Sequence, residues 1–315
     1  MRASGGNRVE WAAIPSDVRA ALDDRLGSAV VRAENQSGGF SPGLAARCVL
    51  ADGRRVFLKA VSPDQNPQAC RIHRREAEIA GQLPEWVPAP RLLDVHDDGR
   101  WVALVFDDID GCQPDEPWSD EQLGKVLPAL RRFSDSVTPS PVDGLQSVVD
   151  RHRPVFSGWR RLAGGDGETA GLDPWAAQHL VRLAEVESGW EDAAVGDTLL
   201  HADLRADNLL LADDGDVWIV DWPWACIGAA FVDLAFLLPS VGIGGPEPDA
   251  VVERFGLFDD VAPEALAAVV AALAGFFTRS SLDPPPPGLP RLRSFQRAQA
   301  DVATAWLRAL LDSPT

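Results

Sequence analysis

Four polar side chains near the middle of the chain have types and a spacing that could support chemistry. His201, Asp203 and Asn208 lie close together in the sequence, and Asp221 follows after an Asp-Asp-Gly turn and a β-prone run at Val217–Val220. A tight turn between β-prone runs predicts a hairpin. Such a hairpin would bring Asp203, Asn208 and Asp221 close together.

Two carboxylates and an amide are a set of groups that phosphoryl transfer can use. That reaction needs a carboxylate to accept or orient the acceptor hydroxyl, and hard oxygen ligands to hold Mg²⁺ against phosphates. Asp203 suits the first role, and Asn208 and Asp221 suit the second. Each residue alone could be a turn, capping or strand-end residue. Their combination with an upstream strand lysine, Lys59, favours phosphoryl transfer.

The N-terminal third of the chain predicts a small antiparallel sheet that carries helices. Asp-Gly pairs between β-prone runs are strong hairpin signals. One such hairpin places Lys59 on its second strand, directly before a helix. The expected strands are Ser28–Ala33, Leu44–Leu50, Arg55–Ala60, Arg91–His96 and Arg100–Phe106, and the expected helices are Pro15–Leu26 and Gln68–Leu83.

After Phe106 the pattern becomes mainly helical. An acidic run, Asp107, Asp108 and Asp110, predicts an exposed, solvated linker. A chain of 315 residues exceeds the usual size of a single core. We therefore predict an α+β protein with two lobes, residues 1–108 and 109–315. The helices expected in the second lobe are Ser119–Ser134, Pro174–Ser188, Phe231–Leu238, Pro263–Arg279 and Arg291–Leu311.

Composition narrows the class of protein. The formal net charge of −18 argues against a nucleic-acid partner. The four cysteines are far apart and predict neither a zinc framework nor a disulfide scaffold. The N-terminus has no apolar signal core, and the apolar run within Ala265–Phe277 is shorter than a bilayer span. We expect a cytoplasmic protein with no membrane partner. The sequence carries no signal for its oligomeric state.

The motif segments resemble a known family. His-x-Asp-x-x-x-x-Asn at 201–208, followed by Ile-Val-Asp-Trp at 219–222, is similar to the aminoglycoside phosphotransferase and choline kinase branch of the protein-kinase-like fold. HADLRADNLLL is close to that branch's catalytic loop, and IVDWPWACIGAAFVDLA is close to its metal segment. The resemblance covers most of the chain. It implies a small antiparallel-sheet lobe that binds nucleotide and a larger, mainly helical lobe for catalysis and substrate binding.

The resemblance also implies roles for individual residues. Asp203 would be the catalytic base that orients the acceptor hydroxyl, and Asn208 and Asp221 would bind Mg²⁺ bridging the nucleotide phosphates. His201 would organise the loop rather than move protons. Asp233 would hydrogen-bond the backbone of the catalytic loop.

A second group of residues would bind the nucleotide. Lys59 would reach the α- and β-phosphates, held by Glu76 on the following helix, with Glu78 as the alternative partner. By contrast, Arg205 and Asp207 of the catalytic motif are expected on the loop surface.

A glycine-rich loop would cover the phosphates, and the linker would meet adenine through its backbone. These residues are Ser37, Gly38, Gly39, Phe40 and Ser41 in the loop, and Phe106 and Asp107 in the linker.

The glycine-rich loop allows one other interpretation. Gly39–Gly43 matches the Gly-x-Ser-x-Gly nucleophile elbow of hydrolases, with Ser41 as nucleophile. That elbow requires a helix after the turn, whereas Leu44–Leu50 predicts a strand. The hydrolase interpretation is therefore disfavoured.

The function that these patterns favour is an ATP- or GTP-dependent phosphotransferase acting on a hydroxyl of a small molecule. An aminoglycoside or other antibiotic is the first choice of acceptor, since acidic residues could bind a polycation. Choline, homoserine and methylthioribose are alternatives within the family. A non-catalytic nucleotide-binding relative stays open. A protein kinase would need an activation segment and an Ala-Pro-Glu-like anchor, and neither is visible.

Overall fold

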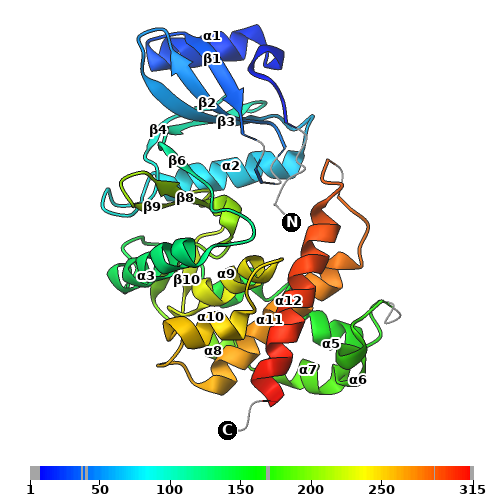
Figure 1. The fold of residues 1–315 in the computed structure, drawn as a ribbon. Coiled ribbons are helices and arrows are strands. Elements are labelled where there is room, and N and C mark those ends of the chain that lie inside the picture. Colours follow the sequence, from blue (N-terminus) through cyan, green and yellow to red (C-terminus); the bar gives the residue numbers. More distant parts are fainter. Residues whose placement is uncertain (1–7, 37, 40–41, 168–170, 287, 313–315) are drawn as a thin grey trace.

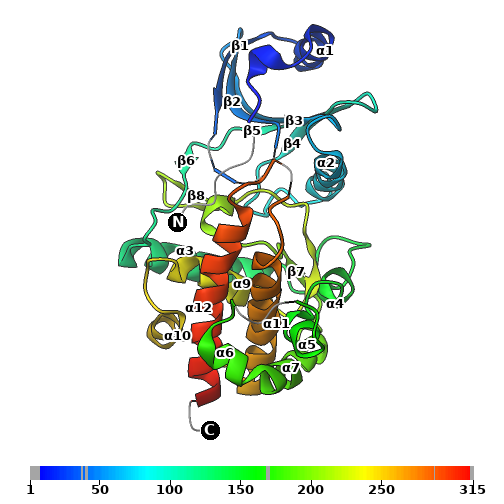
Figure 2. The same ribbon diagram turned by 90° about the vertical axis from the view of Figure 1, so that its right-hand side faces the viewer.

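The chain folds into a small sheet lobe and a larger helical lobe, as predicted (Figures 1 and 2). This computed structural model describes residues 8–36, 38–39, 42–167, 171–286 and 288–312. The sheet and its two helices form one end of the molecule, and α11 and α12 run along the length of the other lobe.

The small lobe is built on five antiparallel strands in the order β1-β2-β3-β5-β4. The two predicted hairpins are present as β2–β3 and β4–β5. β3 is the central strand, so Lys59 is held in the most constrained part of the sheet. The strands are β1 Val30–Asn35, β2 Leu44–Leu50, β3 Arg55–Val61, β4 Leu92–Asp97 and β5 Val102–Asp107.

One helix covers each face of this sheet. α1 (Ser16–Leu26) packs against the outer face, and α2 (Pro67–Ala80) packs against the face toward the large lobe (Figure 1). Successive residues of a strand point to opposite faces. Val61 of β3 packs in the cluster beside α2, so Lys59, two residues earlier, points to the α2 side as well. α2 ends at Ala80, earlier than the expected Leu83.

The large lobe is mainly helical and also contains two small sheets. β6 (Gly111–Cys112), β8 (Leu209–Ala212) and β9 (Val217–Ile219) form one sheet, and β7 (Thr198–Leu200) pairs with β10 (Cys226–Gly228). The helices are α3 Asp120–Ser136, α4 Val148–His152, α5 Gly158–Ala163, α6 Pro174–Gln178, α7 Leu180–Ser188, α8 Trp190–Ala193, α9 Val232–Gly242, α10 Pro248–Phe255, α11 Pro263–Ser281 and α12 Leu292–Asp312, with 3₁₀ turns η1 Trp11–Ala13 and η2 Ala206–Asn208.

One expectation for this lobe was wrong. The helix predicted at Pro174–Ser188 is divided into α6 and α7 at His179, whose ring stacks on Trp175 and contacts the Trp175 carbonyl through Nδ1 at 2.8 Å. The short helices α4, α5, α8 and α10 were not predicted. Helices this short bury too few side chains to show a clear period in the sequence.

α11 is the central helix of the large lobe. Its length and composition would allow it to cross a membrane, but most of it is buried against α12, α5, α7 and α8. A core helix passes the same test of composition. α5 approaches it closely: a Cβ on Gly158 would lie 1.9 Å from the Gly275 carbonyl oxygen, so only glycine fits there.

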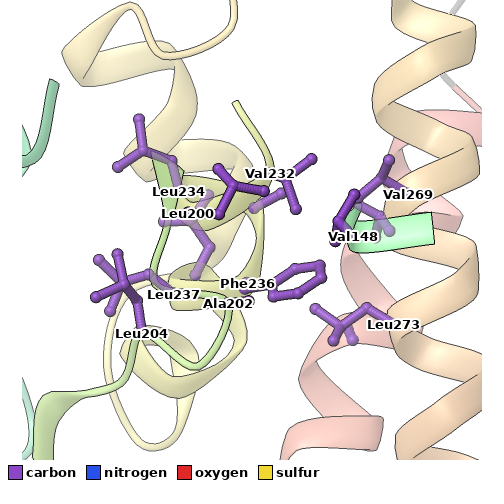
Figure 3. Packing of buried hydrophobic residues seen from close by; sticks show 14 of the residues in the cluster. Val148, Leu200, Ala202, Leu204, Val232, Leu234, Phe236, Leu237, Val269 and Leu273 are labelled. Atoms are coloured by element: carbon purple, nitrogen blue, oxygen red, sulfur yellow. The ribbon is translucent and has the colours of Figure 1, made fainter. Parts of the chain in front are cut away.

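The segment that carries the motif rests on this core. Figure 3 shows Leu200, Ala202 and Leu204 of that segment packed among side chains of α9, with Val269 and Leu273 of α11 close by. Ala202 and Leu204 are buried. Their anchoring on both sides of Asp203 holds the loop in place.

Candidate active site

The candidate catalytic loop begins where β7 ends. Asn208 lies at the end of η2 and folds back on Asp203: its amide donates to the Asp203 carbonyl oxygen at 2.7 Å and to carboxylate Oδ2 at 3.3 Å. Ala202 adopts a left-handed backbone conformation with φ 61°, which turns the chain sharply ahead of Asp203. The hairpin predicted from the Asp-Asp-Gly turn is present as β8–β9, and it brings Asp221 back to this loop.

Asp233 and His201 hold the loop from below. The Asp233 carboxylate accepts the backbone N–H groups of His201 at 2.7 Å and Ala202 at 2.8 Å, which are the bonds that the resemblance implied. The His201 ring accepts the Asp203 N–H at Nδ1 and contacts the Val220 carbonyl oxygen through Nε2 at 2.9 Å. Burial lowers the pKa of His201 to about 4, so the ring is neutral and unsuited to moving protons near neutral pH.

Arg205 and Asp207 are not on the loop surface, contrary to the sequence prediction. The Arg205 guanidinium hydrogen-bonds the carboxylates of both Asp203 and Asp207, with two contacts of 3.0 Å to Asp207. It also lies 5.9 Å from the centre of the Phe295 ring of α12. The motif could not reveal this because Arg205 becomes enclosed only when α12, far along the chain, packs against the loop.

The carboxyl of Asp203 is tuned toward neutral pH. Burial raises the pKa of Asp203 to about 7, while the Arg205 guanidinium opposes that rise. A carboxyl with a pKa near the working pH is suited to accept a proton from a hydroxyl.

Lys59 links the two lobes. Its Nζ lies 2.6 Å from Glu76 Oε1 and 2.8 Å from Asp221 Oδ1. The pairing expected between Lys59 and Glu76 is therefore present. Glu78 points elsewhere and pairs with Arg75 in solvent. Burial raises the pKa of Glu76 to about 7 against the effect of Lys59. Although burial opposes it, the Lys59 ammonium lowers the pKa of Asp221 to about 2.

Asn208 and Asp221 present two hard oxygens to the same cavity. The Asn208 amide nitrogen donates to Asp203, and Asp221 Oδ1 accepts from Lys59. Both residues line the cavity, and Asn208 Oδ1 and Asp221 Oδ2 are the oxygens not used in these hydrogen bonds. Mg²⁺ is usually bound by one or two protein oxygens together with substrate phosphates and water. This donor set fits such an ion. No cluster of three or more His, Cys, Asp or Glu side chains suited to a metal occurs in the described part of the chain.

Asp221 is held in an unusual backbone conformation. Its φ of 69° lies in the left-handed region, which aspartate tolerates better than most residues. The Val220 N–H donates to the Asn208 carbonyl oxygen at 3.0 Å, which ties the end of the hairpin to the catalytic loop. Such strain persists only where surrounding contacts enforce it and is frequent at functional sites.

A cavity of about 510 Å³ lies between the lobes. It is large enough for a nucleotide-sized ligand. The predicted site residues that line it are Gly38, Gly39, Lys59, Glu76, Phe106, Asp107, Asn208 and Asp221. The other predicted members of the glycine-rich loop, Ser37, Phe40 and Ser41, lie outside the described residues. β2 follows this loop as a strand, so the helix that a nucleophile elbow requires is not there.

The linker is only partly the solvated turn that was expected. The Asp108 side chain is 2% exposed and pairs with Arg47 and Arg55. Asp107 pairs with Arg91, and Asp110 is exposed. These ion pairs fasten the linker to β2 and β3, and they could not be predicted because the arginines come from strands distant in sequence.

Arg8 and Gln113 are among the lining residues of the cavity that were not predicted. Gln113 follows β6 and donates from Nε2 to the Asp207 carbonyl oxygen at 2.9 Å; a Cβ on Gly38 would lie 2.7 Å from the same nitrogen. Arg8 precedes the first helix and donates to the Gly38 carbonyl oxygen. Neither stands in a motif, so no sequence signal identified them.

Similarity to known proteins decides the family of this chain. Residues 39–269 match the model of the phosphotransferase enzyme family, APH. The chain belongs to this family. The resemblance predicted from the motif segments is thereby confirmed.

The individual proteins to which this chain is similar carry different names. Homoserine kinase of Rhodospirillum rubrum is 28% identical over 186 residues, which cover 58% of this chain and 55% of that protein. The chain thus spans about half the length of this curated relative. Choline kinase LicA from Streptococcus pneumoniae has a similar fold, with a TM-score of 0.60 at 14% identity over 93% of this chain and 100% of that one. The ternary complex of streptomycin, ATP and APH(2")-IIa gives a TM-score of 0.53 at 12% identity, over 94% and 96% of the two chains.

Proposed function

We propose that this protein is an ATP-dependent kinase that transfers the γ-phosphoryl group to a hydroxyl of a small molecule. The observation that carries the proposal is the convergence of Lys59, Asn208 and Asp221 on one cavity between the lobes, with the Asp203 carboxylate hydrogen-bonded to Asn208. Family membership supports the same reaction class. A protein of similar fold whose structure contains ATP supports ATP as the donor.

Each residue has a role that follows from its contacts. Lys59 would bind phosphate oxygens while Glu76 holds its ammonium. Asp203 would orient the acceptor hydroxyl and take up its proton, with its carboxylate held by Asn208 and Arg205. Asn208 and Asp221 would hold Mg²⁺, which supplies neutralisation of phosphate charge when bound.

For the acceptor, we propose a small molecule that carries a cationic amine as well as the hydroxyl, with an aminoglycoside or other antibiotic as the first candidate. Asp115 and Asp207 line the cavity, and Asp203 shares Arg205 with Asp207, so these three carboxylates bring two more negative charges than Arg205 offsets. Such charge would favour a cationic acceptor. Homoserine and choline also carry a cationic nitrogen, and they are the second candidates. We further propose a cytoplasmic location, where ATP is available.

The reaction is tested by ATP consumption with Mg²⁺ and a panel of aminoglycosides, macrolides, homoserine, choline and methylthioribose. Turnover with one class identifies the acceptor. Asp203→Asn should keep MgATP binding by calorimetry and lower kcat by about 10²–10⁴-fold, the usual contribution of a positioned base. Asp213→Asn, on the exposed turn of the same hairpin, is the matched control and should keep wild-type activity. An Asp203→Asn variant with full activity would refute the assignment of the base.

A non-catalytic relative is distinguished by the same measurements. It would bind MgATP and consume none with any acceptor. It would also show no difference between the Asp203 and Asp213 variants.

A further inference from the structure

Arg8 reaches the cavity from a segment that precedes the whole sheet. Its backbone is fastened at the glycine-rich loop: the next residue, Val9, donates its N–H to the Gly43 carbonyl oxygen at 3.1 Å. The Asn35 amide donates to the Val9 carbonyl oxygen at 3.2 Å. Asn35 ends β1 and Gly43 directly precedes β2, so the segment is clipped to both ends of the loop.

The side chain of Arg8 runs along the loop and into the cavity. Its Nη2 donates to the Gly38 carbonyl oxygen and lies 3.6 Å from where a Cβ on Gly39 would stand. Arg8 lines the same cavity as Lys59 and Asp221. The guanidinium is thus on the side where the loop would cover phosphates.

The charge of Arg8 acts on groups that line this cavity. Burial lowers the pKa of Arg8, and the Asp221 carboxylate opposes that change. The guanidinium stays protonated, because its ordinary pKa is far above neutral. The same charge contributes to the lowered pKa of His73, on the α2 wall. The Asp221 carboxylate that acts on Arg8 is one that a metal would share.

We propose that Arg8 binds phosphate oxygens of the bound nucleotide, so that the segment ahead of α1 forms part of the nucleotide site. This inference rests on the proposed function. The planar guanidinium presents paired donors that match a phosphate group, and a phosphate between Lys59 and Arg8 would accept hydrogen bonds from both side chains. The hydrogen bond to the Gly38 carbonyl oxygen holds the guanidinium beside the glycine-rich loop.

The test is calorimetric binding of MgATP, MgADP and adenosine to the full chain. Arg8→Met keeps the length and apolar part of the side chain and removes the guanidinium with its paired N–H donors. It should weaken MgATP and MgADP binding by about tenfold or more, the usual effect of losing a charge-assisted hydrogen bond, and leave adenosine binding unchanged. Arg8→Lys keeps the charge without the paired donors and should give an intermediate loss for the two phosphorylated ligands.

The matched control is Arg32→Ala, which removes an exposed arginine of β1 paired with Glu34 and should bind all three ligands as wild type does. Arg8→Met with wild-type affinity for MgADP would overturn the inference. Equal weakening of all three ligands would show that Arg8 only supports the glycine-rich loop. Tighter MgATP binding would show that the Arg8 side chain obstructs the nucleotide site. Each of these results would also overturn the inference. If the wild-type protein bound no MgATP, the proposed function itself would fail.

Discussion

The ammonium of Lys59 lies 2.8 Å from a carboxylate oxygen of Asp221, although 162 residues separate them. Lys59 belongs to the central strand of the small lobe, and Asp221 follows the hairpin of the large lobe. Because Glu76 contacts the same ammonium, two carboxylates from different lobes share one cation. An arriving phosphate would compete with Asp221 for Lys59 and release an Asp221 oxygen toward a metal.

Loss of the Glu76 charge should impair phosphate binding. Glu76→Gln removes the carboxylate that holds Lys59 on the α2 side, so Lys59 should stay on Asp221. We expect kcat/KM for ATP to fall by about tenfold or more, since charge-assisted hydrogen bonds contribute about 1.5–3 kcal/mol. Glu78→Gln, two residues along the same helix and 62% exposed, is the control and should match wild type in steady-state kinetics. Equal effects of the two variants would contradict the role of Glu76.

The metal requirement should depend on Asp221. Asp221→Asn removes a charged oxygen from the donor set that it forms with Asn208. The Mg²⁺ concentration for half-maximal activity should rise by about tenfold or more, which a Mg²⁺ titration at fixed ATP would measure. Asp213→Asn should leave it unchanged, because that carboxylate lies on the exposed turn. An unchanged Mg²⁺ requirement in Asp221→Asn would place the ion elsewhere.

The pH profile should report Asp203. Its pKa is raised to about 7 by burial, and only the ionised carboxylate can accept the hydroxyl proton. Activity should therefore fall as the pH drops below about 7. Arg205→Ala removes the cation that opposes the rise, so the acid limb of kcat/KM should move to higher pH. Arg205→Lys keeps the charge and should leave the limb near its wild-type position. A limb that stays in place in Arg205→Ala would show that Arg205 does not act on this carboxylate.

The stability of the catalytic loop should depend on Asp233. Asp233→Ala leaves the buried N–H groups of His201 and Ala202 without an acceptor. Each unsatisfied buried donor costs about 1–3 kcal/mol, so the free energy of unfolding should fall by about 2–4 kcal/mol in urea titrations. Asp233→Asn retains one carbonyl acceptor and should lose less. Equal losses in the two variants would show that the hydrogen bonds are not the cause.

Local patterns in the sequence were sufficient to predict much of the fold and of the candidate site. The hairpins β2–β3 and β8–β9 follow from turn residues between β-prone runs, because a hairpin joins neighbours in the chain. The catalytic motif keeps His201, Asp203 and Asn208 within one loop, so their proximity needs no distant contact. The family resemblance rested on the same continuous segments.

Only the tertiary structure decided the contacts between distant segments. Arg205 is enclosed by α12, Asp108 is paired with arginines of β2 and β3, and Arg8 enters the cavity beside the glycine-rich loop. An arginine or aspartate looks the same in the sequence whether it faces solvent or a buried partner. Its environment depends on which segments pack beside it, and that packing is set by burial of the apolar faces of the whole chain.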